Sequence, residues 1–171
     1  MHPVIDAFDA QVERALDAIR SPTLDGVLYP VSSAADHSLL WFIVGALRSA
    51  RTGDVRFATR FAAAMGLESA LTNGPVKSVF RRTRPAPDSP DGPLPYGLHR
   101  PITSSFPSGH ATAAFTAAVL LADRRRLPWF ALATVVAGSR VYVRMHHASD
   151  VVGGALFGLA LGRVLRPWVR G

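Results

Sequence analysis

The stretch Ser105-Phe106-Pro107-Ser108-Gly109-His110 begins an uncharged run of small and apolar residues that extends from Ala111 to Ala122. A Pro-Ser-Gly turn at the start of a helix exposes unpaired backbone N–H groups, which together with the positive end of the helix dipole favour an anion. His110 adds a side chain that exchanges a proton near neutral pH. Taken alone, the stretch is more typical of an ordinary helix cap than of a functional site.

The apolar residues on either side of this stretch follow one pattern. Segments rich in Ala, Leu, Val and Gly alternate with loops that hold nearly all the arginines, which is the layout of a small helical membrane protein. No segment reaches the roughly 18 uncharged residues of an unmistakable spanning helix. Shorter uncharged centres still span when their charged ends snorkel or face the protein interior. We therefore expect one all-α domain over residues 1–171, an integral membrane helical bundle.

The expected bundle has about five transmembrane helices, preceded by an amphipathic helix over 1–21 that is too charged to span and that Ser21-Pro22 ends. This first helix is expected to lie along the membrane interface or to pack on the bundle. The bundle occupies 34–167, and a proline-rich active-site loop covers about 82–106. The spans are placed at 34–49, 55–76, 108–123, 128–142 and 151–165.

Three local patterns refine the spans. Asn73-Gly74-Pro75 is expected to disturb or end the second span. Glycines at helical spacing in the last span favour close helix–helix contact; they are Gly153, Gly154, Gly158 and Gly162. Asp36 and His37, at the head of the first span, are interpreted as a cap with a polar partner, because a metal pair would need a third ligand nearby.

Charge and composition exclude several classes of function. The formal charge is +7, but the basic residues form no continuous stripe interleaved with exposed aromatic residues, so nucleic acid is not an expected partner. The chain has no cysteine, which excludes disulfides, thiolate metal sites and cysteine nucleophiles. The first 20 residues carry four acidic groups and no basic segment, so no cleavable signal peptide is expected.

Five spans bring four helix ends to one membrane face: the ends of the second and fourth spans and the starts of the third and fifth. Residues about 70 positions apart therefore converge there without any special folding assumption. The polar residues at these ends are Lys77, Arg84, Ser108, Gly109, His110, Arg140, His146 and Asp150.

These residue types suit phosphoryl transfer. Arginine offers forked donors to phosphoryl oxygens and lysine a compact charge, so Lys77, Arg84 and Arg140 can surround a phosphate. Ser108 and the N–H groups around Gly109 complete the cradle, and such fixed donors stabilise the charge that develops during transfer. No cofactor is needed, because the cations and a helix terminus supply this stabilisation.

The histidines supply the chemistry. His146 and Asp150 are four residues apart and share a face if the segment is helical. A carboxylate on one imidazole nitrogen fixes the tautomer and makes the other nitrogen a better nucleophile, while His110 can protonate the leaving oxygen. The alternative is a metal site at His110, His146 and His147, which lacks an accompanying cysteine or second carboxylate.

These residues resemble the signature of the type-2 phosphatidic acid phosphatase superfamily, which includes membrane lipid phosphatases and vanadium haloperoxidases. Three motifs match in order and spacing, namely Lys77 with six residues before Arg84-Pro85, then Pro107-Ser108-Gly109-His110, then Ser139-Arg140 with five residues before His146 and three more before Asp150. The resemblance implies a helical bundle and a phosphohistidine on His146 oriented by Asp150, with His110 as general acid. It also implies phosphate binding by Lys77, Arg84, Ser108, Gly109 and Arg140. It gives His147 no role and does not cover residues 1–76.

The expected activity is hydrolysis of the terminal phosphate of a lipid phosphate or diphosphate, with polyprenyl phosphates favoured. The alternatives are phosphatidic acid, phosphatidylglycerophosphate or decaprenyl-phosphoribose phosphate as substrate, a soluble phosphatase, and a catalytically silent lipid-binding protein. Haloperoxidase activity would need vanadate and a larger, less apolar bundle.

We expect a bacterial plasma membrane protein whose site faces away from the cytoplasm, because nine arginines lie on the opposite face. These are Arg48, Arg51, Arg56, Arg124, Arg125, Arg126, Arg163, Arg166 and Arg170.

Overall fold

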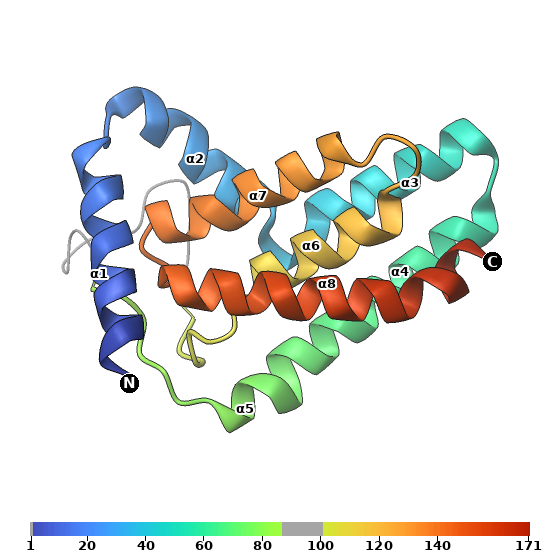
Figure 1. Ribbon diagram of the computed structural model, residues 1–171. Helices are drawn as coiled ribbons and strands as arrows, with labels where there is room; N and C mark the ends of the chain where they lie inside the picture. Colours follow the sequence, from blue (N-terminus) through green and yellow to red (C-terminus); the bar gives the residue numbers. More distant parts are fainter. Residues whose placement is uncertain (1, 87–100) are drawn as a thin grey trace.

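The computed structural model describes residues 2–86 and 101–171, apart from the side chain of His37, and within these ranges it contains helices and no strand. The all-α expectation is thus confirmed for the described residues, while residues 87–100 of the expected active-site loop lie outside them. Figure 1 shows the helices in chain order. They are α1 (Pro3–Ala18), α2 (Pro22–Ala34), a 3₁₀ turn (Asp36–Ser38), α3 (Leu39–Thr52), α4 (Val55–Leu71), a wide π turn (Thr72–Val76), α5 (Lys77–Val79), α6 (Gly109–Leu121), α7 (Leu127–Tyr142) and α8 (Ala148–Arg170).

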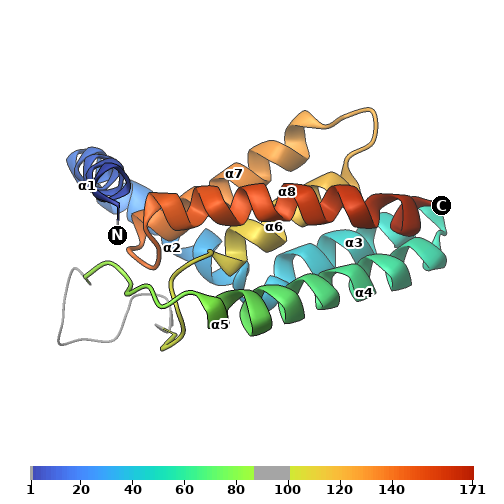
Figure 2. The same cartoon turned by 60° about the horizontal axis from the view of Figure 1, so that its bottom comes forward.

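Helix α6 is the centre of the bundle, and α3, α4, α7 and α8 all pack against it (Figures 1 and 2). Most of its residues are buried, on every face. A helix that is apolar all round is stable only when neighbours cover it on all sides. The uncharged run after His110 therefore becomes the core, and its first turn is held at one end of the bundle.

The glycines of α8 allow it to lie directly on α6. A Cβ atom at Gly158 would lie 2.4 Å from the Thr112 carbonyl oxygen, and one at Gly154 would lie 2.5 Å from the carbonyl oxygen of Ser108. Because the two helices lie this close, the Thr116 hydroxyl donates a hydrogen bond of 3.1 Å to the Gly158 carbonyl. The predicted close contact is confirmed, and it fixes the start of α6 against the start of α8.

Two helix breaks lie at the same end of the bundle as the start of α6. The predicted break at Asn73-Gly74-Pro75 is confirmed, because Gly74 has non-helical φ and ψ of −91° and −106°. The expected start of the first span at 34 is wrong. A 3₁₀ turn follows α2, Ser38 adopts a left-handed φ of 61°, and α3 begins only at Leu39.

Helix α2 has no counterpart among the expected elements. The Ser21-Pro22 pair does end α1, but it also starts α2, because the Ser21 hydroxyl accepts a hydrogen bond from Leu24 N and Pro22 occupies the first turn. Serine is a favoured N-cap and proline suits the first helical position, so the pair that stops one helix begins the next.

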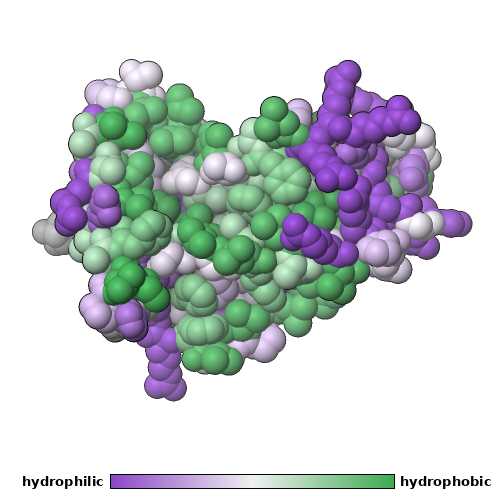
Figure 3. Space-filling model, in the orientation of Figure 1, coloured by the Kyte–Doolittle hydropathy of each residue, from purple (hydrophilic) through white to green (hydrophobic). Residues whose placement is uncertain are grey.

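By length and composition, the described helices include one that could cross a membrane, α8, or two if the bent pair of α2 and α3 counts as one span. Helix α6, with 13 residues, is apolar but shorter. Large apolar side chains are exposed along α3, α7 and α8, including Phe42, Val135 and Leu156. Figure 3 shows the resulting broad hydrophobic band, with hydrophilic residues gathered mainly at one end. The count of five spans is therefore not established by helix length.

Helix α1 lies across the ends of α7 and α8 (Figure 1). Its acidic side faces the protein, and Asp9 is buried there. The apolar side chains of Val4, Ile5 and Phe8 are exposed instead. Helix α1 therefore turns Asp9 toward the bundle, where basic and polar side chains pair with it.

Candidate active site

Three of the four helix ends expected to converge line a cavity of about 340 Å³, and the start of α8 adjoins them without lining it. Lys77 reaches it from α5, Gly109 and His110 from the first turn of α6, and Arg140 from the last turn of α7. The Ser108 N–H donates to the Asp150 carbonyl at 3.0 Å, which joins the starts of α6 and α8 directly. Topology thus collects the polar residues at one end of the bundle.

His146 lies between α7 and α8 in a tight loop, where the backbone N–H groups of Met145 and His146 both donate to the Arg140 carbonyl, at 3.0 and 3.1 Å. Its ring is buried, and its Nδ1 lies 2.7 Å from the Ser105 carbonyl oxygen. A carbonyl can only accept, so Nδ1 carries the hydrogen and Nε2 keeps its lone pair. Burial lowers the pKa of His146 to about 3. The ring is therefore neutral near pH 7, with Nε2 ready to act as a nucleophile.

Asp150 lies near the same ring nitrogen of His146. Its Oδ2 is 3.7 Å from Nδ1 of His146, within ion-pair range but longer than a hydrogen bond. The carboxylate accepts from the His147 N–H at 2.9 Å and from the Arg82 guanidinium. The hydrogen bond that sets the tautomer thus goes to Ser105, a role the sequence did not reveal. Asp150 is placed to stabilise a positive imidazole.

Arg84 faces the reactive nitrogen. Its Nη1 lies 3.2 Å from Nε2 of His146 and donates to the Met145 carbonyl at 2.7 Å, while Nε donates to the Pro101 carbonyl at 3.1 Å. This guanidinium marks the place where an anion would meet the lone pair of Nε2.

Lys77 and Arg140 complete a cationic cluster with Arg84. The Lys77 ammonium donates to the Asn73 side chain at 3.0 Å. Burial, followed by the charges of Arg84 and Arg140, lowers the pKa of Lys77 to about 8. Arg140 is almost fully buried and donates to the Ser32 hydroxyl at 2.5 Å, while its Nε has no hydrogen-bond partner in the described part of the chain. Three cations held together, one with an unused buried donor, are suited to bind an anion.

His110 has a partner that the sequence did not predict. Its Nε2 lies 2.8 Å from Oδ1 of Asp36, and Arg140 Nη1 lies 3.6 Å from the same oxygen. Asp36 is expected to cap a helix and to have a polar partner: the partner is His110, while the starts of the 3₁₀ turn and of α3 show no side-chain capping hydrogen bond among the described residues. The expected helix topology could have predicted this contact, because the start of the first span lies on the same face as the starts of the third and fifth.

The Ser105–His110 stretch combines both of its possible roles. Ser108 is buried, and its hydroxyl caps α6 by accepting from Ala111 N at 3.4 Å. Gly109 instead lines the cavity, where an added Cβ would lie 3.3 Å from the Asn73 side-chain oxygen. The cap fixes the helix start, and the glycine keeps the backbone open to a ligand.

The histidines of the alternative metal site have separate partners. His110 contacts Asp36, His146 contacts Ser105, and His147 lies 3.1 Å from Glu13. No group of three or more His, Asp or Glu side chains in residues 2–86 and 101–171 is placed to hold a metal ion. The geometry gives the metal interpretation no support.

Comparison with known proteins points to one family. The model of the PAP2 superfamily matches residues 57–171. A decaprenylphosphoryl-5-phosphoribose phosphatase of Mycobacterium tuberculosis is 34% identical over 91 residues, which cover 53% of this chain and 49% of that protein. The chain therefore spans about half the length of this curated relative.

Two solved structures share the fold. A transmembrane PAP2-type phosphatidylglycerolphosphate phosphatase from Bacillus subtilis superimposes with a TM-score of 0.73 and 26% identity, covering 98% of this chain and 87% of the other. LpxE from Aquifex aeolicus gives a TM-score of 0.71 and 28% identity over 91% of this chain and 93% of the other. The structural likeness therefore extends beyond the region that carries the motifs and includes nearly all the helices.

Proposed function

The chain belongs to the PAP2 superfamily, and from that premise we propose that it is an integral membrane phosphatase that hydrolyses the terminal phosphate of a lipid phosphate or diphosphate. One observation carries the proposal: the guanidinium of Arg84 lies 3.2 Å from Nε2 of a neutral, buried His146, beside Lys77 and Arg140. A phosphate here would relieve the repulsion among three cations and meet a nucleophile at once.

The proposed reaction has two steps. Nε2 of His146 attacks phosphorus, a P–N bond forms, and the P–O bond to the lipid breaks while His110 gives a proton to the leaving oxygen. Water then attacks phosphorus and gives a proton to His110, the P–N bond breaks so that Nε2 of His146 regains its lone pair, and inorganic phosphate leaves. Arg84 turns its donor from Nε2 to a phosphoryl oxygen, and Lys77 and Arg140 bind the others.

Two carboxylates support the histidines in this scheme. Asp150, 3.7 Å from Nδ1, stabilises the positive charge that His146 acquires on attack. Asp36, 2.8 Å from Nε2 of His110, stabilises the protonated form that a general acid needs. The ring that attacks phosphorus and the ring that donates the proton thus differ in their partners, one a backbone carbonyl and the other a carboxylate.

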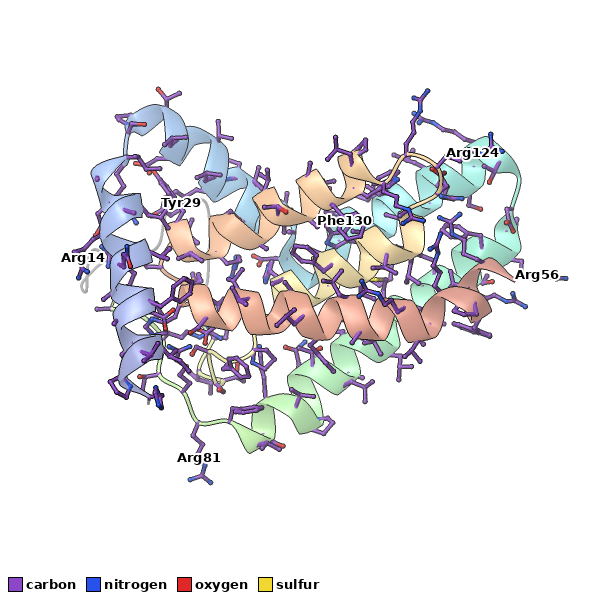
Figure 4. All side chains as sticks on the ribbon, in the orientation of Figure 1. Arg14, Tyr29, Arg56, Arg81, Arg124 and Phe130 are labelled. Atoms are coloured by element: carbon purple, nitrogen blue, oxygen red, sulfur yellow. The ribbon has the colours of Figure 1, made fainter. Side chains whose placement is uncertain are left out.

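The proposed membrane arrangement uses five spans: α3, α4, α6, α7 and α8. It is supported by the exposed apolar side chains of α3, α4, α7 and α8 and by the likeness to a transmembrane phosphatase over 98% of the chain. Figure 4 labels Arg56 and Arg124 at the end of the bundle opposite the site. By the positive-inside tendency, that arginine-rich end faces the cytoplasm and the site faces outward.

Polyprenyl phosphates are the favoured substrates. A site at one end of an apolar bundle admits a head group while the hydrocarbon chain stays in the bilayer. The named activity of the mycobacterial relative supports a prenyl-linked substrate, and that of the Bacillus structure supports phosphatidylglycerophosphate as the alternative. A catalytically silent lipid-binding protein is disfavoured because every motif position is filled.

The test is phosphate release by the purified full-length chain in detergent. The panel contains undecaprenyl diphosphate, decaprenyl-phosphoribose phosphate, phosphatidylglycerophosphate and phosphatidic acid, with His146→Ala as the blank. We expect release from at least one prenyl substrate and none from the blank. Folded wild-type protein that binds these lipids but releases no phosphate would favour the silent lipid-binding alternative.

A further inference from the structure

Helix α1 presents a stripe of carboxylates to the loop that carries His146. Asp9, Glu13 and Asp17 are spaced four residues apart, so they share one face of the helix. Asp9 accepts from the Ser149 N–H at 2.8 Å and from the Ser149 hydroxyl at 2.7 Å. Glu13 lies 3.1 Å from His147 Nδ1, and both oxygens of Asp17 lie 2.8 Å from Arg144 Nη2. The partners of this stripe flank His146 on both sides.

Arg82 connects the stripe to Asp150. Its Nη2 donates to Asp9 Oδ2 at 2.5 Å, and its Nη1 donates to the Ser149 hydroxyl at 2.7 Å and to Asp150 Oδ1. The three charged side chains are buried, with exposed fractions of 5% for Asp9, 9% for Arg82 and 0% for Asp150. A buried charge that loses its partner is strongly destabilised, so each member of this chain holds the next in place.

The backbone of Arg82 reaches the same histidine by a second route. Its carbonyl accepts from the Ser105 N–H at 2.9 Å, and the Ser105 carbonyl accepts from His146 Nδ1 at 2.7 Å. Arg82 also lies two residues before Arg84, whose guanidinium faces Nε2 of His146. A shift in the position of Arg82 would therefore move Asp150, the Ser105 carbonyl and Arg84 together.

We propose that α1 is a positioning element of the active site, in which Asp9, acting through Arg82, holds Asp150 and the Ser105 carbonyl where they orient the His146 ring. The proposal rests on the phosphatase function proposed above. Asp9 does not touch the reacting atoms, so its effect passes through Arg82 and Ser149. The family match begins at residue 57, and this role of α1 therefore lies outside the region that defines the family.

Asp9→Asn in the full-length protein tests the proposal. The amide keeps the shape of the side chain but removes the charge opposite Arg82. We expect kcat to fall by about 10- to 100-fold, because a displacement of about 1 Å at the reacting groups has an effect of this size. The KM and the inhibition constant for inorganic phosphate should change by no more than about twofold, because Lys77 and Arg140 are held by Asn73 and Ser32 and not through Arg82.

Asp6→Asn is the matched control, since Asp6 lies on the same helix and is exposed; its kcat should equal that of wild type. Asp9→Glu, which keeps the charge, should recover part of the lost kcat. If Asp9→Asn fails to fold, Arg82→Lys replaces it, because lysine keeps the charge but not the forked donors.

Wild-type kcat in folded Asp9→Asn protein would refute the positioning role and leave the proposed function intact. A loss of kcat that follows the fall in melting temperature and disappears on cooling would also refute it, by showing a structural role alone. An inactive wild-type protein on the whole lipid panel would contradict the proposed function and the positioning role with it.

Discussion

The N-terminal and C-terminal ends of α6 both lie among cationic side chains, but the two ends use them differently. At the C-terminal end, carbonyl oxygens accept from arginines, with Arg170 donating to Leu120 at 2.8 Å and to Ala122 at 2.7 Å, and Arg48 donating to Leu121 at 2.9 Å. There the positive charge complements the negative end of the helix dipole. These arginines stabilise the fold.

At the N-terminal end, Lys77 and Arg140 lie beside the positive end of the same dipole and beside Arg84. Here burial, followed by the charges of Arg84 and Arg140, lowers the pKa of Lys77 to about 8. A phosphate would satisfy all of them together. At one end of α6 the arginines satisfy the helix carbonyls, whereas at the other Lys77 and Arg140 line the cavity that we propose binds phosphate. Substitutions at the two ends should separate stability from activity.

The largest effect is expected from His146→Ala. Without the nucleophile, phosphate release should fall by at least about 10⁴-fold, and rapid-quench labelling with a ³²P substrate should give no acid-labile phosphoenzyme. His147→Gln is the neighbouring control and should still form the phosphoenzyme. Full activity of His146→Ala would show that another group attacks phosphorus.

Arg140→Lys should give the next largest effect, a fall in kcat/KM of about 10²-fold, because lysine keeps the charge but loses the forked donors to the developing phosphoryl charge. Arg170→Lys, the matching change at the other end of α6, should leave kcat/KM near wild type. Equal losses from the two variants would contradict the separation between the ends.

The pH dependence of kcat/KM should report Lys77. Since its pKa is about 8 in the free protein, the binding cation is present below pH 8, and kcat/KM should fall by up to about tenfold per pH unit above it. The pKa of His146, about 3, keeps this ring neutral from pH 5 to 9, so its titration adds no limb there. Lys77→Arg should move the alkaline limb above pH 10. If the alkaline limb of Lys77→Arg stayed where it is in wild type, the group that titrates there would not be Lys77.

Arg170→Ala should give the smallest effect on catalysis and a measurable one on stability. The substitution removes two charge-assisted hydrogen bonds to the end of α6, and we expect a loss of about 1–3 kcal/mol of unfolding free energy. The measurement is reversible unfolding in detergent, with kcat determined well below the melting temperature. A large loss of kcat in stable protein would contradict a purely structural role.

Several features followed from the sequence because they depend on neighbours along the chain or on helix topology. The uncharged run of α6, the break at Asn73-Gly74-Pro75 and the glycines of α8 are local patterns, and the structure confirms them. The resemblance to the lipid phosphatase superfamily is also confirmed by the match over residues 57–171. The alternating directions of successive helices then collected the motif residues at one end of the bundle.

The tertiary structure alone decided which groups pair there. Asp36 meets His110 across 74 positions, Arg82 meets Asp9 across 73, and the Ser105 carbonyl meets His146 across 41. A carboxylate on a helix face has the same local signature whether it faces water, a cap or a buried arginine, and a backbone carbonyl has no signature at all. The sequence determined the phosphate-site motifs around Ser105–His110, whereas packing decided which partners fix the tautomer of His146 and hold α1 against it. The physical reason is that these interactions form only when distant segments exclude water together.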